Sequence, residues 1–168
     1  MEKILITESQ IRYRLLELSK EIDEFYKGKE ITLIGVLNGS IIFLSDLIRN
    51  IKTPSHLDCI SVSSYRGGKT SGELVFHSHL KLNVEGSHVV LVDDIFDTGK
   101  TLNELKNFFT PLSPASLEFC VFLKKDVPRK FDINPRFVGF DIPNHFVYGY
   151  GLDIAEKFRN LPYVAYKG

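Results

Sequence analysis

Three aspartates and a Thr-Gly turn follow one another in the middle of the chain. Asp93 and Asp94 come directly after the apolar run 89–92, and Asp97 precedes the segment 98–101. The two adjacent acids could accept hydrogen bonds from vicinal sugar hydroxyls, while backbone N–H groups and threonine hydroxyls at a helix start could bind a phosphate. Ligands of open α/β sheets bind where strands end, so the pattern predicts a sugar site beside a phosphate site.

The same segment has one plain structural interpretation and two other functional ones. As structure alone it is a capped helix after a core strand, but three acids at one strand end repel one another unless a cation or a hydrogen-bond donor binds there. A nucleoside-triphosphate loop requires Gly-x-x-x-x-Gly-Lys-Thr, and the two Gly-Lys-Thr triplets have Ser63 and Asp94 at the first glycine. A phosphoacceptor receiver domain has its acid pair near its start, whereas this pair lies mid-chain.

The elements that must position these residues alternate between strand and helix patterns. Thr7 and Gln10 have capping-box spacing, and an apolar stripe with helical spacing follows at Ile11, Leu15, Leu18, Ile22 and Phe25, with Gly28 as its stop. Ile41, Leu44 and Ile48, and later Leu102, Leu105, Phe108 and Phe109, predict two further helices. Strands are predicted at 31–36, 57–63, 73–81, 87–92, 116–123, 136–140 and 146–148. This order indicates an α/β fold with a central, mainly parallel sheet flanked by helices.

Length and composition set outer limits on the function. The 168 residues correspond to one domain, 1–168, and 43% apolar residues suffice for a packed core. Because 21 basic residues balance 21 acidic ones, overall charge alone gives no binding to nucleic acid or to a membrane. Cys59 and Cys120 lie in apolar runs and are interpreted as structural thiols. The sequence has neither a signal-peptide pattern nor a membrane-spanning run, so we expect a cytoplasmic protein.

The segment 89–101 resembles the phosphoribosyl pyrophosphate (PRPP) motif of type I phosphoribosyltransferases. Other segments stand in the order seen in the hypoxanthine-guanine phosphoribosyltransferases, namely 37–40, Ser64-Tyr65, Lys124-Lys125, 137–140 and 146–159. The resemblance implies a small hood subdomain formed from terminal segments. It also implies purine salvage, in which PRPP and hypoxanthine or guanine give a nucleotide and pyrophosphate with Mg²⁺. The expected partners are these small molecules and further copies of the chain, in a homodimer or homotetramer.

The resemblance assigns a role to each matching residue. Asp97 matches the acid that exchanges a proton with purine N7, and Asp153 matches the magnesium-linked acid. The remaining assignments are PRPP binding by Asp93, Asp94, Thr98, Gly99, Lys100 and Thr101; pyrophosphate binding by Leu37, Asn38, Gly39 and Arg159; purine binding by Lys124, Phe146 and Val147; and a catalytic lid at Ser64 and Tyr65. Relatives often carry Lys where this chain has Asn38, and many carry Glu in place of Asp93.

Two rival functions and two further patterns stay open on the sequence. The rivals are a xanthine-preferring or adenine-preferring transferase, of which Lys124 disfavours the adenine form, and a non-catalytic PRPP-fold regulator that binds nucleotide and RNA. His77 and His79 alternate as a metal pair would, but no further ligand is spaced to complete a site, and we interpret them as surface residues. The basic run 124–136, apart from Lys124, is interpreted as surface charge.

Overall fold

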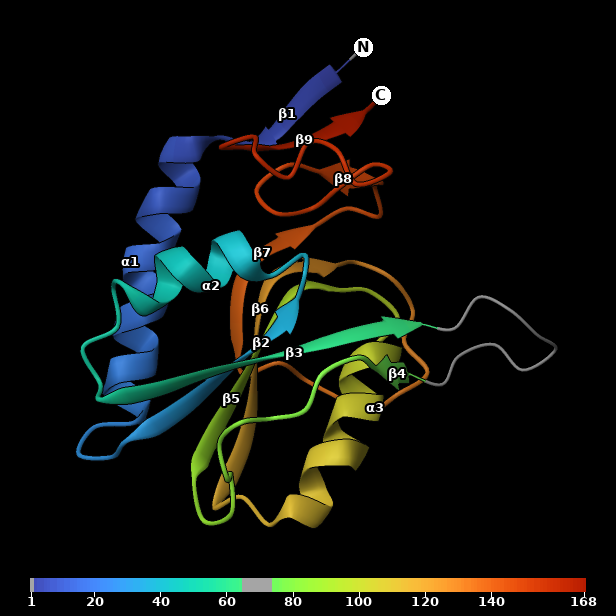
Figure 1. Cartoon of the computed structure of the whole chain (residues 1–168). Coiled ribbons are helices and arrows are strands. Elements are labelled where there is room, and N and C mark those ends of the chain that lie inside the picture. The colour runs from blue at the N-terminus through green and yellow to red at the C-terminus, as the bar shows by residue number, and fades with distance from the viewer. Residues whose placement is uncertain (1, 65–73) are drawn as a thin grey trace, which may run out of the picture.

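The structure is a computed structural model that describes residues 2–64 and 74–168. Within these residues the chain forms two sheets and three α-helices (Figure 1). In chain order the elements are β1 (Glu2–Ile6), α1 (Glu8–Phe25), β2 (Ile31–Leu37), α2 (Ile41–Ile48), β3 (Ser55–Ser64), β4 (Leu74–Phe76), β5 (His88–Phe96), α3 (Lys100–Phe109), the 3₁₀ turn η1 (Thr110–Leu112), β6 (Ser116–Lys125), β7 (Phe137–Ile142), β8 (Val147–Tyr148) and β9 (Val164–Lys167).

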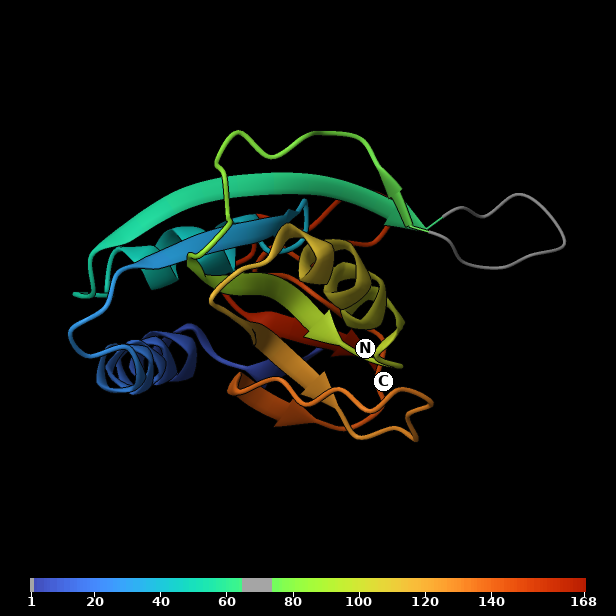
Figure 2. The same cartoon turned by 90° about the horizontal axis from the view of Figure 1, so that it is seen from below.

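The larger sheet has the strand order β4-β3-β2-β5-β6-β7. Strands β3, β2, β5, β6 and β7 are parallel, and only the short β4 pairs antiparallel, with β3. Helices α1 and α2 pack on one face of this sheet and α3 packs on the other (Figures 1 and 2). Each face therefore has its own cluster of buried hydrophobic residues. The predicted α/β class, a mainly parallel sheet flanked by helices, is confirmed.

Strand β5 is the centre of the sheet, with β2 on one side and β6 on the other. Val89, Val90, Leu91 and Val92 are all fully buried, because helices cover both faces of the strand. Strand pairing continues past the predicted end at residue 92 to Phe96. Asp93 and Asp94 therefore belong to the strand itself rather than to a loop after it.

The helices follow the predicted spacing with two differences. The Thr7 and Gln10 capping box is present, but Phe25, the last residue of α1, is 42% exposed and Tyr26 is buried instead, because the chain turns inward where the helix ends. In α2 the buried residues are Phe43, Leu44 and Leu47, while Ile41 is 48% exposed. The strand predicted over 73–81 is also shorter in the structure, because only the three residues of β4 pair with β3.

A second sheet lies beyond one end of the first and joins the two ends of the described chain. It has the order β1-β9-β8, all antiparallel, with Glu2 opposite Lys167. We call this sheet, together with residues 149–163 that connect β8 to β9, the hood (Figure 1). None of the helices formed by the described residues combines the length and the apolar run that a membrane span needs.

Candidate active site

The predicted PRPP-binding loop and pyrophosphate-binding loop follow the two strands at which the connections of the large sheet diverge. From β2 the chain crosses through α2 to β3 on one side, whereas from β5 it crosses through α3 to β6 on the other. Parallel sheets leave a crevice outside the strand ends at such a reversal, and ligands bind there. The loop 37–40 after β2 and the loop 97–99 after β5 flank this point of reversal, which we call the crevice.

The first side is fixed by very close packing between Gly39 and Asp94. A Cβ atom built on Gly39 would lie 1.6 Å from Asp94 Oδ2, so a side chain at position 39 would require the Asp94 carboxylate to move. The Ser40 hydroxyl donates to the Val36 carbonyl oxygen at 2.6 Å and holds the loop against its strand. The Leu37–Asn38 peptide bond in this loop is cis.

The adjacent acids of β5 differ in exposure. Asp93 is buried, Asp94 is partly exposed, and the Asp94 backbone N–H donates to Asp93 Oδ1 at 2.9 Å. Burial, and then the neighbouring Asp94 charge, raise the pKa of Asp93 well above its ordinary value. Burial also raises the pKa of Asp94, although hydrogen bonds and the Arg159 charge partly oppose it. The pair therefore favours a ligand that brings hydrogen-bond donors.

The second side is the predicted phosphate loop. Gly99 is the N-cap of α3 with φ 86°, a left-handed conformation suited to glycine, and it has no side chain that could cap the helix. First-turn N–H groups of a helix lack partners within the helix and carry its positive end. Thr98 is exposed, and Lys100 and Thr101 are partly exposed beside this helix end. Residues 98–101 thus lie at the start of a helix, the position that the predicted phosphate site requires.

The two consecutive lysines of β6 contact different acids. Lys125 Nζ lies 3.1 Å from Asp97 Oδ2, and the Lys125 side chain is only 12% exposed. Lys124 Nζ lies 3.5 Å from Asp141 Oδ1, on a more exposed part of the sheet end. Successive residues of a strand point to opposite faces, so only one of the two lysines contacts Asp97.

The sequence pattern predicts Lys125 as surface charge, and this prediction is wrong because the side chain is largely buried beside Asp97. The signal that could have found it is strand alternation, once the strand is known to continue past residue 123. Arg129, also assigned to surface charge, lies with its guanidinium 4.5 Å from the Phe96 ring centroid and donates to the Lys125 carbonyl oxygen. These two basic residues therefore lie beside the carboxyl end of β5.

The hood brings its own predicted residues to the crevice. Arg159 Nη2 lies 3.0 Å from Asp153 Oδ1, and Arg159 Nη1 donates to the Gly151 carbonyl oxygen at 2.8 Å. Gly151 packs against the Gly39 carbonyl oxygen so closely that a Cβ atom would be 2.3 Å away. This contact places the Asp153 and Arg159 pair beside the loop 37–40.

The predicted purine-binding residues of the hood differ in exposure. Phe146 is 65% exposed, as a ring that stacks on a ligand must be, whereas Val147 is buried in β8.

Ser64 is the last residue of β3, paired through its backbone with Leu74, and the other predicted lid residue, Tyr65, lies outside the described residues. His77 Nε2 lies 2.7 Å from the Ser63 hydroxyl, in keeping with a surface position rather than a metal pair.

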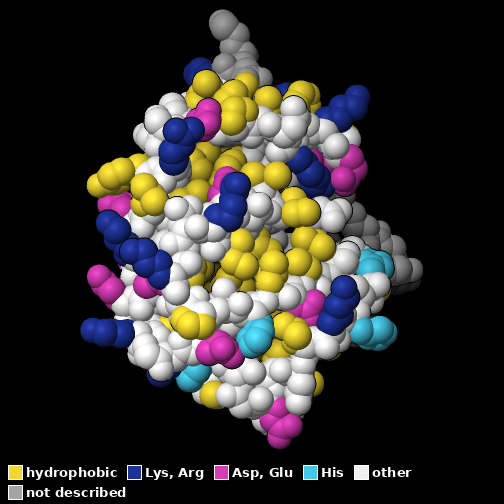
Figure 3. Space-filling model, turned by 60° about the vertical axis from the view of Figure 1, so that its left-hand side comes forward, with side chains coloured by type: hydrophobic (Ala, Val, Ile, Leu, Met, Phe, Trp, Pro, Cys, Tyr) yellow, Lys and Arg dark blue, Asp and Glu magenta, His cyan; other side chains and the backbone are white. Residues whose placement is uncertain are grey.

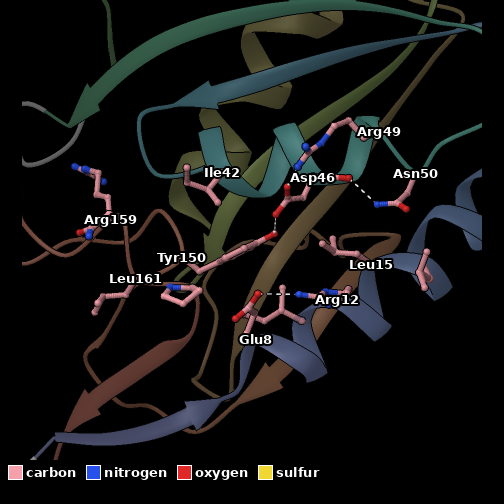
Figure 4. Close-up of a pocket in the computed structure, with 14 residues that line it drawn as sticks. Glu8, Arg12, Leu15, Ile42, Asp46, Arg49, Asn50, Tyr150, Arg159 and Leu161 are labelled. Atoms are coloured by element: carbon pink, nitrogen blue, oxygen red, sulfur yellow. Dashed lines mark hydrogen bonds and ion pairs between the residues drawn. The ribbon is translucent and has the colours of Figure 1, made fainter.

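A cavity of about 600 Å³ adjoins the crevice on the side of α1, α2 and the hood. Arg159 lies on its border, and the other charged residues around it are already paired: Arg12 with Glu8, and Arg49 with Asp46 (Figure 4). Asp93, Asp94 and Asp97 do not line it. The cavity is therefore separate from the strand end that carries these three acids.

Comparisons with known proteins agree with this arrangement. A family model described as a phosphoribosyl transferase domain matches residues 7–155. A hypoxanthine-guanine phosphoribosyltransferase of Aquifex aeolicus (strain VF5) is 44% identical over an alignment of 164 residues that covers 96% of this chain and 92% of the relative. A hypoxanthine-guanine-xanthine phosphoribosyltransferase of Tritrichomonas foetus is 39% identical over 98% of this chain and 90% of its own.

Solved structures give the same result. A hypoxanthine-guanine phosphoribosyltransferase from Bacillus anthracis, with a HEPES molecule in its active site, has a TM-score of 0.94 at 42% identity and covers 99% of this chain and 98% of its own. The resemblance noted in the sequence is confirmed over nearly the whole length. The chain belongs to the phosphoribosyltransferase family, and its similarity is to the hypoxanthine-guanine members of that family.

Proposed function

We propose that this protein transfers the 5-phosphoribosyl group of PRPP to N9 of hypoxanthine or guanine, giving the nucleotide and pyrophosphate. The observation that carries the proposal is the crevice itself: an acid pair, a phosphate loop and a third acid meet a glycine loop and an arginine at the sheet's point of reversal. The relatives at 39–44% identity named for this reaction support it.

PRPP would occupy the length of the crevice. The 5-phosphate would accept hydrogen bonds from the loop 98–101, where the positive end of α3 stabilises an anion. The ribose hydroxyls would donate to Asp93 and Asp94, whose pKa values are raised by burial. The pyrophosphate would bind the loop 37–39 and Arg159, whose planar donors suit phosphate oxygens.

The purine would lie between Phe146 and the end of β5. Asp97 is 45% exposed, and its carboxylate would take or return the N7 proton as N9 attacks or leaves the anomeric carbon. Lys124 is proposed to donate to the 6-oxo group, which favours oxopurines over adenine. Phe146 would stack on the base, and the Val147 backbone would contact its edge.

The donor chemistry of the site suits Mg²⁺, which binds carboxylate, phosphate and water oxygens. Among the described residues there is no cluster of three or more His, Cys, Asp or Glu side chains that could hold a metal alone. Asp153, with the oxygens of the substrate and water, would hold the ion, and the bound ion would neutralise the leaving pyrophosphate. The Asp153 carboxylate already accepts the Glu156 backbone N–H at 2.8 Å, which orients it.

A second candidate substrate is xanthine, because the relative from Tritrichomonas foetus is named for all three oxopurines. Xanthine differs from guanine at position 2, which Lys124 does not read. We propose hypoxanthine and guanine as the main substrates and treat xanthine as the alternative that the assay separates.

The testing experiment is an Mg²⁺-dependent assay of the purified protein with PRPP and, separately, hypoxanthine, guanine, xanthine, adenine and uracil. Formation of pyrophosphate and of the mononucleotide are both followed. Turnover with hypoxanthine and guanine is expected, and omission of Mg²⁺ should abolish it. PRPP binding without turnover on any base would overturn the proposal and favour a regulatory role.

We also propose that the protein self-associates as a homodimer or homotetramer. Tyr13 and Leu16 on α1 and Ile41 and Ile42 on α2 are apolar residues exposed to solvent, and Figure 3 shows hydrophobic patches among charged side chains on one face of the molecule. Exposed apolar patches are typical of protein interfaces. Sedimentation equilibrium of the wild type and of Leu16→Glu tests this; a monomeric wild type would contradict it.

A further inference from the structure

Tyr150 connects the hood to α2 from a buried position. Its side chain is 5% exposed, and its hydroxyl donates to Asp46 Oδ2 at 2.6 Å (Figure 4). Asp46 lies on the helix that begins directly after the loop 37–40. One hydrogen bond therefore joins the hood to the element that carries the proposed pyrophosphate loop.

The backbone around Tyr150 is held in an unusual conformation. Gly149, Tyr150 and Gly151 have φ values of 94°, 50° and 98°, and a left-handed conformation costs energy at a residue with a side chain. The Tyr150 N–H donates to the Leu161 carbonyl oxygen, and the Gly151 N–H donates to the Arg159 carbonyl oxygen at 2.9 Å. The conformation directs the Tyr150 ring inward and Gly151 toward the loop 37–40.

The neighbour of Tyr150 makes the contact between the two halves of the site. Gly151 packs on the Gly39 carbonyl oxygen, and its own carbonyl oxygen accepts a hydrogen bond from Arg159. A shift of Tyr150 would thus move both the Gly39 contact and the Arg159 guanidinium. The side chain remains a hydrogen-bond donor at working pH, because burial, and then the hydrogen bond to Asp46, raise the pKa of Tyr150 well above its ordinary value.

We propose that Tyr150 is a positioning residue for PRPP, whose hydrogen bond to Asp46 aligns Arg159 and Asp153 with the loop 37–39. The inference rests on the proposed function, in which this loop and Arg159 bind the pyrophosphate. Tyr150 has no proposed contact with the purine, so a substitution of Tyr150 should weaken the binding of PRPP and not that of the purine. The Tyr150 ring also packs 4.8 Å from the Phe122 ring centroid, a contact that phenylalanine preserves.

The central experiment compares Tyr150→Phe with the wild type. Loss of one buried hydrogen bond of about 1 kcal/mol should raise KM for PRPP about five- to tenfold, while KM for hypoxanthine and kcat change less than about twofold. Asp46→Ala should give the same pattern, and the double variant should be no worse than either single variant, since one interaction is lost in all three. Asp46→Asn, which keeps an acceptor oxygen, should restore most of the PRPP affinity.

Arg49→Gln is the matched control. Arg49 pairs with the other oxygen of Asp46 but is 70% exposed and does not contact Tyr150, so its removal should leave both KM values unchanged. Equal increases in both KM values, or additive effects of Tyr150→Phe and Asp46→Ala, would overturn the proposal.

Titration calorimetry with inorganic pyrophosphate separates this proposal from the proposed function. Weaker pyrophosphate binding by Tyr150→Phe supports the positioning role even when the wild type turns over none of the tested purines, the result that would overturn the proposed function alone. Unchanged pyrophosphate binding, together with an unchanged KM for PRPP, would overturn the positioning role.

Discussion

Asp58 on β3 and Asp93 on β5 are both buried aspartates of the large sheet, but their surroundings are opposite. Asp58 accepts backbone N–H groups from Cys59 at 2.8 Å, Lys81 at 2.6 Å and Leu82 at 3.1 Å. Asp93 accepts the Asp94 N–H and otherwise faces a second carboxyl. A buried carboxylate that the fold supplies with donors is structural, whereas one beside another carboxylate is suited to a ligand.

The pKa values of the two carboxyl groups are shifted in opposite directions. Burial alone would raise the pKa of Asp58, but its hydrogen bonds to three backbone N–H groups lower it overall. Burial and the Asp94 charge raise the pKa of Asp93. Asp58 therefore stabilises the fold above its ordinary pKa and loses this effect as pH falls, while Asp93 makes the free protein less stable as pH rises above about 4.

The largest predicted effect concerns Asp97, the third acid, which is neither buried nor supplied with backbone donors among the contacts described above. Asp97→Asn removes proton transfer but leaves the phosphate loop intact, so kcat should fall about 10²–10⁴-fold with little change in the PRPP dissociation constant. Steady-state kinetics and equilibrium binding measure the two quantities. Asp132 is exposed and has no assigned role in the site, so Asp132→Asn is the control. Equal losses of PRPP affinity and turnover would remove Asp97 from the proton-transfer role.

Asp58→Ala tests whether the buried carboxylate of Asp58 stabilises the fold. The substitution leaves three N–H donors without their acceptor and should lower the free energy of unfolding by about 2–3 kcal/mol, measured by urea denaturation. KM values at a temperature where the variant is folded should match those of the wild type. A change in stability below about 0.5 kcal/mol would show that water replaces the carboxylate, and the contrast with Asp93 would lose its basis.

Substitution of the two lysines of β6 tests which of them contacts the purine. Lys124→Ala should raise KM for hypoxanthine about tenfold, the value of about one hydrogen bond to a charged donor, with KM for PRPP changed less than about twofold. Lys125→Ala is the matched variant, because it removes the cation beside Asp97 and leaves Lys124 in place. If only Lys125→Ala raises KM for hypoxanthine, the base contact belongs to Lys125.

The smallest predicted effect is a change in thermal stability at Asp93. Asp93→Asn removes a buried group whose ionised form the folded state disfavours, so Tm of the ligand-free protein at pH 8 should rise by a few degrees, and the decline of Tm with increasing pH should become shallower. Differential scanning calorimetry between pH 5 and 8 measures both. A variant with lower Tm and an unchanged pH slope would mean that Asp93 is satisfied in the free protein as Asp58 is.

The sequence was most informative where the chemistry lies in one short segment. The order of strand, acids, glycine turn and helix over 89–109 depends on neighbours in the chain, so composition and spacing were enough to predict it. The mainly parallel sheet followed from alternation of strand and helix patterns. The extension of β5 to Phe96 was missed, because polar residues in a strand interior carry no local signal of pairing.

Contacts between distant segments could not be predicted in this way. Gly39 against Asp94, Lys125 with Asp97, and Tyr150 with Asp46 each join residues from different elements. Their geometry depends on how strands and helices stack, which single-residue types do not encode. The burial of Tyr26 in place of Phe25 has the same origin, since the turn after α1 is set by the sheet on which it packs.

The pairing of β1 with β9, which sets Glu2 opposite Lys167, has a consequence for the order of folding. Closing so long a loop of chain carries a large entropy cost, so the hood sheet should form after the parallel sheet has assembled. Asp153 and Arg159 lie between β8 and β9, and they therefore reach their places late in folding. In the folded protein the same sheet should open at lower free energy than β5, and PRPP, by bridging hood and sheet, should slow amide hydrogen exchange in β9.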